Sequence, residues 1–494
     1  MDYRKLKSGN DIRGTAMGTN AVITVEFAEK LGSVFAYWLK TLENKDPVLA
    51  CGHDSRLTSE ALSKAFCRGA VKQGAQVLDF GLCTTPAVCQ SVQRGKLPLS
   101  GAVMVTASHH PPDKNGFKLF TKHYGEISGA VLKEIFLLLN QPLTPSDKEG
   151  SVVNYNYLEN YCQSLAELTR KLIKTDDLCP LLGLNVVIDA SNGTGGFYAK
   201  LLEDLGADTT GSLFLEPDGH FPNHIPNPED TEALQMVSKA VIENEADIGI
   251  IFDADCDRVA VVDSDGKAVN RNRLIALTAA ILLDKTPGIT IVTDSVTSSG
   301  LTKFIGEWGG VHYRYKRGYR NVIDEAIRLN KSGVDCPLAI ETSGHAAFRE
   351  NDFTNDGMYL ATLLVCQTLH GKRNRKKLTE PLESLDEPVE CNEKRFPITA
   401  DDFRAKGLEL IDRVMDDATE ETDRFLAPDN REGVRINFNL EEELSNAWML
   451  LRLSVHDPVV VLNMESDVEG GIAYMENHLR NLIIDMTGID FSTL

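Results

Sequence analysis

The stretch ADIGIIFDADCDR, residues 246–258, decides the fold class of this chain. Its apolar first part predicts a buried strand, and the amphipathic segment before it, from about Thr231 to Glu245, predicts a helix. Its last part is a polar loop with aspartates at alternating positions. A helix, a buried strand and a polar loop in this order indicate βαβ units and mainly parallel sheets.

Two other parts of the chain repeat this order of strand, helix, strand and polar loop. Because ligands collect beyond the carboxyl ends of parallel strands, the loop that ends each repeat is a candidate functional segment. The repeats contain VLACGHDSR (48–56), AQVLDFG (75–81) and GAVMVTASHH (101–110), then LNVVIDASNG (184–193) and 246–258, then GITIVTDSVTSSG (288–300), VHYRYKRGYRNV (311–322) and PLAIETSGH (337–345).

The last part of the chain has a different pattern. A charged segment with prolines at 371–390 predicts a linker or an exposed helix. Beyond it, 430–440 and 446–466 alternate as antiparallel strands do, and 472–486 predicts a closing amphipathic helix. The predicted fold class is therefore α/β, with three similar βαβ-type mixed α/β domains plus a C-terminal α+β domain.

Composition limits the classes of function. The net charge of −21 argues against sequence-independent nucleic-acid binding, and an anionic substrate would require Arg and Lys to be concentrated in a cleft. No apolar stretch approaches the roughly 20 residues that cross a bilayer, and the amino terminus has no apolar segment typical of a secretory signal. Ten scattered cysteines without a C-x-x-C motif favour a reducing, cytoplasmic location.

The DADCDR loop predicts a cation site. Asp253, Asp255 and Asp257 would repel one another, and a divalent cation such as Mg²⁺, Mn²⁺ or Ca²⁺ relieves that repulsion. An EF-hand is excluded, because Arg258 replaces the required glycine and Ser264 the bidentate glutamate. A phosphatase with an aspartate nucleophile is a rival interpretation. A solvated acidic turn without a function is the other interpretation that remains open.

The loop TASHHPPDKNGFK, residues 106–118, predicts a nucleophile. Ser108 follows a strand, and His109 and Lys118 on the same loop could assist a hydroxyl that is otherwise a weak nucleophile. Ser108 could also simply cap a helix. The full thirteen-residue pattern is more specific than Ser-His alone.

These motifs together resemble the α-D-phosphohexomutase family, which includes phosphoglucomutases, phosphomannomutases and phosphoglucosamine mutases. The likeness covers most of the chain and keeps the family's order. It rests on NDIRG (10–14), GHDSR (52–56), TASHHPPDKNGFK (106–118), DGHFPNHIPNPE (218–229), DADCDR (253–258) and ETSGH (341–345).

The resemblance implies four domains that each contribute a loop to a central cleft. We predict a phosphoserine-loop domain at 1–152, a metal-loop domain at 153–270, a sugar-loop domain at 271–388 and a phosphate-binding domain at 389–494, with a hinge after about residue 388. Ser108 would carry the phosphoryl group and, with the three aspartates, bind one Mg²⁺. His109, Lys118 and His345 are candidates for proton transfer, and Arg258 would support the reacting phosphate.

The resemblance also implies residues that bind the substrate. Glu341 and Ser343 suit sugar hydroxyls. Basic candidates are Arg13, Arg56 and the YKRGYR loop with Lys316, Arg317, Gly318 and Arg320. In the fourth-domain phosphate loop, Arg452, Ser454 and Pro458 match the family's R-x-S-[NG]-T-E-P pattern, whereas Val455, His456 and Asp457 depart from it.

The predicted activity is interconversion of hexose 1-phosphate and hexose 6-phosphate through a hexose 1,6-bisphosphate, with glucose favoured and mannose next. Two alternatives remain: a glucose 1,6-bisphosphate synthase, because the phosphate loop is altered, and a non-catalytic sugar-phosphate-binding regulator. The expected partner is a small phosphosugar, with no nucleic acid and no membrane, and the expected state is a monomer or homodimer.

Overall fold

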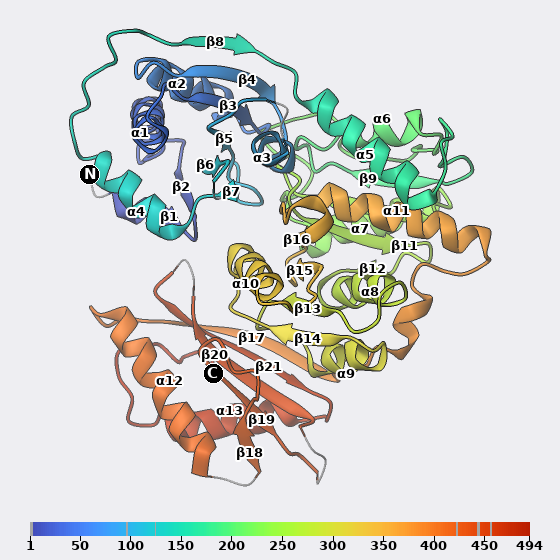
Figure 1. Cartoon of the computed structure of the whole chain (residues 1–494). Coiled ribbons are helices and arrows are strands. Elements are labelled where there is room, and N and C mark those ends of the chain that lie inside the picture. Colours follow the sequence, from blue (N-terminus) through green and yellow to red (C-terminus); the bar gives the residue numbers. More distant parts are fainter. Residues whose placement is uncertain (1–2, 95–96, 124, 421–422, 442–444, 455–456) are drawn as a thin grey trace. The chain divides into compact units, whose positions relative to one another are not determined.

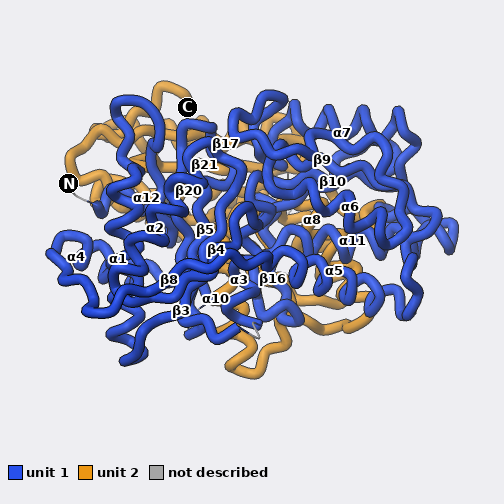
Figure 2. The backbone as a smooth tube through the Cα atoms, turned by 90° about the horizontal axis from the view of Figure 1, so that it is seen from above, with its two compact units in different colours: residues 1–270, 343–380 blue, residues 271–342, 381–494 orange. Residues whose placement is uncertain are grey.

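The computed structural model divides the chain into two compact units, residues 1–270 with 343–380 and residues 271–342 with 381–494 (Figure 2). The structure describes all residues except 1–2, 95–96, 124, 421–422, 442–444 and 455–456. Each unit contains sheets flanked by helices (Figure 1). In the described part of the chain, no helix has the length and apolarity needed to cross a membrane.

The first sheet of the first unit has eight strands in the order β1-β2-β6-β5-β3-β4-β8, with β7 paired to β6. β3 runs parallel to β4 and β5, and β6 returns antiparallel beside β5. The strands are β1 (Lys7–Ser8), β2 (Asp11–Thr15), β3 (Val48–His53), β4 (Gln76–Leu82), β5 (Gly101–Val105), β6 (Lys114–Thr121), β7 (Gly125–Glu126) and β8 (Ser151–Asn154).

Helices α1 (Val25–Glu43) and α2 (Ser59–Val71) share a hydrophobic core with this sheet. The two helices approach closely because Gly32 lies against the backbone of Phe66, where a Cβ would overlap the carbonyl oxygen. Helix α3 (Thr85–Gln93) begins after β4, with the Thr84 hydroxyl capping Ala87 N and Pro86 in the first turn. Helix α4 (Gly129–Leu138) follows β7.

The second sheet of this unit has the order β12-β11-β10-β9, in which only β9 and β10 are parallel. Helix α7 packs its apolar face on the sheet, and helix α5 packs against α11. The elements are α5 (Leu158–Ile173), β9 (Val186–Asp189), α6 (Phe197–Asp204), α7 (Thr231–Glu243), β10 (Ile248–Phe252), β11 (Val259–Asp263), β12 (Ala268–Val269), β16 (Ala346–Phe348) and α11 (Gly357–Arg373).

The second unit contains a parallel set β14-β13-β15 and an antiparallel sheet β17-β21-β20-β19-β18. Two helices and the antiparallel sheet enclose one apolar core. The elements are α8 (Arg271–Leu283), β13 (Thr290–Thr293), α9 (Ser299–Glu307), β14 (Val311–Arg314), α10 (Tyr319–Lys331), β15 (Leu338–Ile340), β17 (Glu390–Pro397), α12 (Phe403–Glu420), β18 (Arg424–Leu426), β19 (Val434–Phe438), β20 (Ala447–Leu453), β21 (Val459–Ser466) and α13 (Gly471–Leu482).

The predicted α/β class with a C-terminal α+β part is confirmed. The expectation of mainly parallel sheets needs correction, because β6 and β11 turn back as antiparallel hairpin partners of β5 and β10. Each hairpin loop holds one of the polar motifs, so the antiparallel return is what folds the loop over the strand end. The four domain boundaries, the hinge after about residue 388 and the central cleft stay predictions.

Candidate active site

The three aspartates of the DADCDR loop form one buried cluster. Strand β10 ends at Phe252, and Asp253, Asp255 and Asp257 follow it with no exposed surface. One carboxylate oxygen from each lies within 4.8 Å of those of the other two. The solvated acidic turn that the sequence allowed is therefore excluded.

The directions of the pKa shifts indicate that negative charge exceeds nearby positive charge in this cluster. Burial and the neighbouring aspartates raise the pKa of Asp253 and Asp257. Burial would raise the pKa of Asp255 too, but Lys118 and the hydroxyl of Thr85 lower it. Among the described residues, Oδ1 of Asp255 and Oδ1 of Asp257 are buried without a hydrogen-bond partner. Free, buried carboxylate oxygens suit a hard cation such as Mg²⁺.

Ser108 lies against this cluster. Its Oγ donates a hydrogen bond of 2.6 Å to Oδ2 of Asp253, and its backbone N–H donates to the Thr106 hydroxyl at 2.8 Å. The residue has a φ of 52°, in the left-handed region that a β-carbon disfavours. Strand β6 follows the loop, so Ser108 does not cap a helix.

Arg56 holds the Ser108 loop in place. Its guanidinium donates to the Asp54 carboxylate and to the carbonyl oxygens of Ser108, His110, Pro111 and Lys114 at 2.5–3.1 Å. These contacts use all five N–H groups of the guanidinium. These contacts make Arg56 an anchor of the loop, and its predicted role in substrate binding stays a prediction.

Two further basic residues lie beside the loop. The guanidinium of Arg13 donates to Oδ2 of Asp11 at 2.8 Å and to the carbonyl oxygen of Thr106. Lys118, on β6, is 2% exposed and donates to Oδ2 of Asp255 at 2.9 Å and to Oδ2 of Asp257. Burial would lower the pKa of Lys118, but the two aspartates raise it, so the ammonium stays charged.

Two histidines are held neutral near the cluster. Nδ1 of His109 lies 3.3 Å from the Ser108 Oγ, and burial and Arg258 lower the pKa of His109. His345 Nε2 accepts a hydrogen bond of 2.9 Å from Nε–H of Arg258, and burial and that guanidinium lower the pKa of His345. Asn355, which sequence analysis missed, lies 2.8 Å from Nδ1 of His345 through its amide nitrogen.

The second unit holds the predicted sugar-binding glutamate. Oε1 of Glu341 accepts a hydrogen bond of 2.6 Å from the backbone N–H of Gly318, whose φ of 112° turns the chain into α10. The next residue, Thr342, donates its hydroxyl to Oδ2 of buried Asp294 at 2.8 Å. Glu341 and the YKRGYR loop are thus joined directly. Arg320 instead pairs with Asp324 of its own helix at 2.6 Å.

Other residues of these loops have different surroundings. Lys316 is exposed, whereas the Arg317 guanidinium reaches to 3.9 Å from the Asp294 carboxylate. Ser343, in the first unit, is 6% exposed. These observations place the side chains but leave their roles as predictions.

Arg452 is the buried cation of the predicted phosphate loop. It lies on β20, is 4% exposed, and its Nε has no hydrogen-bond partner in the described part of the chain. Burial and the nearby Arg317 lower the pKa of Arg452. Ser454 Oγ accepts from the backbone N–H of Asp457 at 3.3 Å. His456 and Val455 lie outside the described residues.

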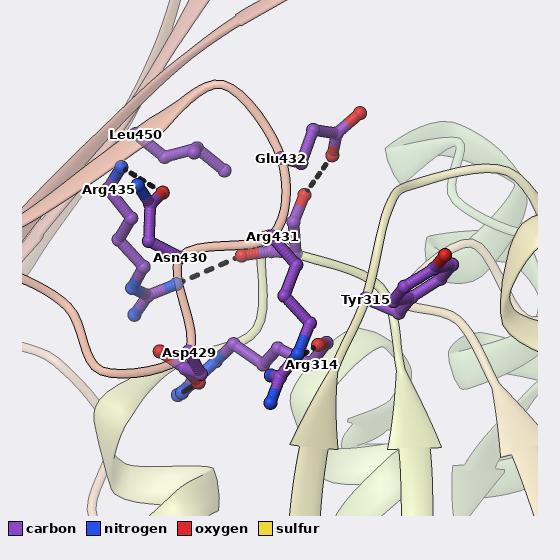
Figure 3. Close-up of a pocket in the computed structure, with 9 residues that line it drawn as sticks. Arg314, Tyr315, Asp429, Asn430, Arg431, Glu432, Arg435 and Leu450 are labelled. Atoms are coloured by element: carbon purple, nitrogen blue, oxygen red, sulfur yellow. Dashed lines mark hydrogen bonds and ion pairs between the residues drawn. The ribbon is translucent and has the colours of Figure 1, made fainter. Parts of the chain in front are cut away.

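A cluster of arginines joins the 427–435 segment to β14 within the second unit (Figure 3). Arg314 forms an ion pair of 2.5 Å with Asp429, and buried Arg435 donates to the carbonyl oxygen of Ser295 at 2.9 Å. The guanidinium of Arg435 also lies 3.6 Å from the ring centroid of Trp448. Sequence analysis missed this cluster, although the charged stretch between two strands was a possible signal.

Comparison with known proteins shows the family to which the chain is related. Models described as phosphoglucomutase/phosphomannomutase, alpha/beta/alpha domains I, II and III, match residues 4–143, 159–266 and 270–387. Phosphomannomutase/phosphoglucomutase of Pseudomonas syringae pv. tomato is 32% identical over 473 residues, which cover 93% of this chain and 90% of that protein. Phosphoglucomutase of Neisseria gonorrhoeae is 30% identical over 486 residues, 97% of each.

Solved structures of known proteins are also similar to this chain. A phosphoglucomutase/phosphomannomutase family protein from Burkholderia thailandensis has a TM-score of 0.80 and 26% identity, covering 99% of this chain and 100% of that one. N-acetylphosphoglucosamine mutase of Aspergillus fumigatus, solved with GlcNAc-6P and magnesium, has a TM-score of 0.56 and 12% identity, covering 98% and 96%, and shows the fold alone.

The fold and these matches define an intramolecular phosphotransferase, an isomerase of hexose phosphates. The α/β/α domains that carry its polar loops are those of one family. The chain belongs to the phosphoglucomutase/phosphomannomutase family, within the α-D-phosphohexomutases.

Proposed function

We propose that the chain interconverts hexose 1-phosphate and hexose 6-phosphate, with glucose favoured and mannose next, through a phosphoserine at Ser108. The observation that carries this proposal is the contact of 2.6 Å between the Ser108 Oγ and Asp253, inside a buried cluster of carboxylates. A hydroxyl held against a candidate cation site is placed to accept and return a phosphoryl group.

Each half of the reaction moves one phosphoryl group. A free hydroxyl of the sugar phosphate attacks the phosphorus on Ser108. The bond from the Ser108 oxygen to phosphorus breaks as the new sugar–phosphate bond forms. The proton of the sugar hydroxyl passes to a neutral imidazole and from there to the departing Ser108 oxygen. The resulting hexose 1,6-bisphosphate reverses its orientation. Its other phosphoryl group then returns to Ser108, and the proton of the Ser108 hydroxyl passes by the same route to the departing sugar oxygen.

The cation is proposed from the carboxylates and from the magnesium in the Aspergillus structure. Ser108, Asp253, Asp255 and Asp257 would hold one Mg²⁺, which would neutralise the charge that develops on the transferring phosphoryl group. Hexose 1,6-bisphosphate would also act as the activator, because it phosphorylates an unmodified Ser108.

His345 and His109 are the proposed proton acceptors. Both imidazoles are neutral, which an acceptor requires. The Nε2 lone pair of His345 accepts a hydrogen bond from Arg258, so that guanidinium must move before the nitrogen can take a proton. Arg258 would then be free to contact the phosphoryl group. Lys118 is charged and held by two aspartates, which supports an electrostatic role instead.

The remaining substrate contacts are proposed from chemistry. Glu341 and Ser343 would bind sugar hydroxyls, and Arg317 and Arg452 would bind the phosphate that is not being transferred, because two adjacent guanidinium groups repel until an anion joins them. Further proposed contributors to substrate binding are Arg13, Lys316, Gly318, Arg320, Ser454 and His456. The enzyme would act in the cytoplasm on a small phosphosugar, as a monomer or homodimer.

³¹P NMR tests this function directly. The purified protein is incubated with Mg²⁺, glucose 1-phosphate and a trace of glucose 1,6-bisphosphate, beside Ser108→Ala and the matched control Ser164→Ala. Ser164 is in the same unit, and its hydroxyl donates to the carbonyl oxygen of Tyr161. Glucose 6-phosphate is expected from the wild type and from Ser164→Ala, and none from Ser108→Ala. Turnover by Ser108→Ala would overturn the carrier.

³¹P NMR with further sugar phosphates, together with a binding measurement, separates the mutase from the two alternative functions. Bisphosphate accumulating in excess of the enzyme would indicate a bisphosphate synthase. No conversion of glucose, mannose or glucosamine phosphates, together with saturable binding of one of them, would indicate a non-catalytic regulator.

A further inference from the structure

We propose that Thr85 is a positioning residue that aims the carboxylate of Asp255 at the metal site, an inference that rests on the proposed function. Thr85 is the first residue of α3, and it lies 170 positions from Asp255 in sequence. Both residues are buried, with Thr85 3% exposed and Asp255 fully enclosed.

Thr85 contacts Asp255 twice. Its backbone N–H donates to the Asp255 carbonyl oxygen at 2.9 Å, and its Oγ1 donates to Oδ2 of the same residue. The start of the helix does not depend on these contacts, because the Thr84 hydroxyl caps it by accepting from Ala87 N. The hydroxyl of Thr85 is therefore not needed to cap the helix, and it donates to Asp255 instead.

The two donors to Asp255 act on one oxygen. Oδ2 accepts from Thr85 and from the Lys118 ammonium, whereas Oδ1 is buried and has no partner among the described residues. A carboxylate that rotates about its Cβ–Cγ bond exchanges its oxygens, and donors on one oxygen prevent that exchange. Oδ1 would then stay available to ligate a cation, as partners of metal ligands commonly ensure.

Lys118 cannot supply this orientation by itself. Its ammonium is shared between Asp255 and Asp257, and a rotating ammonium is a less directional donor than a hydroxyl on a short, β-branched side chain. The Thr85 hydroxyl adds a second hydrogen-bond donor to Oδ2 of Asp255, and the direction of this donor is fixed. It also ties the loop after β10 to the helix after β4, so the metal geometry depends on how these two sheets pack within the first unit.

Binding of Mn²⁺, followed by electron paramagnetic resonance in the absence of substrate, tests the inference in the full-length protein. Thr85→Val removes the hydroxyl at nearly constant volume, and Thr85→Ser keeps it. We expect Thr85→Val to weaken Mn²⁺ binding about tenfold to a hundredfold, and Thr85→Ser to bind as the wild type does. In assays, Thr85→Val should need more Mg²⁺ for half-maximal activity and recover most of its kcat at saturating Mg²⁺.

The matched control is Thr169→Val, since Thr169 is 1% exposed and its hydroxyl donates to the Leu165 carbonyl oxygen at 2.9 Å, within α5. Equal Mn²⁺ affinity of wild type and Thr85→Val would overturn the role of Thr85 while leaving the metal site intact. Absence of Mn²⁺ binding by the wild type would overturn both. If Thr85→Val does not fold, Thr85→Ala against Thr85→Ser makes the same comparison.

Discussion

The ammonium nitrogen of Lys118 lies 2.9 Å from Oδ2 of Asp255, and both side chains are almost completely buried. The same nitrogen also pairs with Asp257. Lys118 is therefore the main internal counter-charge of the carboxylate cluster, and the stability of the first unit should depend on it.

Lys118→Met keeps the length of the side chain and removes its charge. Breaking a buried ion pair leaves uncompensated charge and costs about 3 kcal/mol or more. We expect the melting temperature to fall by roughly 5 °C or more, and we expect added Mg²⁺ to restore more stability to the variant than to the wild type, because the cation would replace the lost charge.

Lys64→Met is the control for Lys118→Met. Lys64 pairs with Glu60 on the exposed face of α2, and exposed pairs contribute little. Its melting temperature should match that of the wild type. A Lys118→Met protein as stable as this control would contradict the assignment of Lys118 as counter-charge.

Arg452→Gln should remove an anion site. If Arg452 and Arg317 share a phosphate, inorganic phosphate will raise the melting temperature of the wild type and have less effect on the variant. Loss of a charge-assisted hydrogen bond should raise the KM for glucose 1-phosphate about tenfold to a hundredfold.

Arg480→Gln controls for the loss of a positive charge in the same unit. Arg480 is a partly exposed residue of α13 that lies 3.5 Å from Glu476. It should respond to phosphate as the wild type does. Equal stabilisation of wild type and Arg452→Gln would place the anion elsewhere.

A buried ion pair in the first unit makes stability depend on pH. His224 Nε2 lies 3.0 Å from Oδ2 of Asp189, and Nδ1 lies 2.7 Å from the Ile225 carbonyl oxygen. Burial would lower the pKa of His224, but its bond to Asp189 raises it. The pair's contribution is therefore complete below the pKa of the unfolded histidine, about 6.5, and it is lost as pH rises through the higher pKa of the folded protein.

Thermal unfolding of wild type and His224→Gln, measured from pH 5.5 to pH 9, checks this dependence. The difference in melting temperature should be largest at the acid end and shrink as pH rises. His220→Gln, in the same segment, is the matched control because His220 is exposed beside Asp218. A constant difference for His224→Gln across the range would show that folding does not shift the pKa of His224, which would contradict the prediction.

Much of the site was predictable because its residues are close in sequence. The alternating aspartates at 253–257 and the Ser108 loop each follow a strand whose apolar run is a local signal. The carboxyl ends of such strands lie on one edge of a sheet. Local pattern therefore predicted the α/β class, the candidate loops and their order along the chain.

Arg56 shows where local pattern is insufficient. An arginine in a polar loop suits an anionic substrate, and the sequence alone favoured that role. In the structure the loop of residues 106–118 folds over Arg56, so its backbone carbonyl oxygens accept from the two terminal nitrogens of the guanidinium, and the Asp54 carboxylate accepts from Nε–H. The acceptors around a guanidinium come from chain segments that fold onto it. These segments can be distant in sequence, so the residues next to the arginine do not reveal them.

The sequence by itself determined the types of residue present: three carboxylates at alternating positions, a serine at a strand end and a basic loop with Arg317. Only the tertiary structure decided their partners, such as Thr85 and Lys118 on Oδ2 of Asp255. The physical reason is the distance along the chain over which each kind of interaction acts. Hydrophobic periodicity acts over neighbouring residues, whereas a hydrogen bond across 170 positions forms only after two sheets have packed.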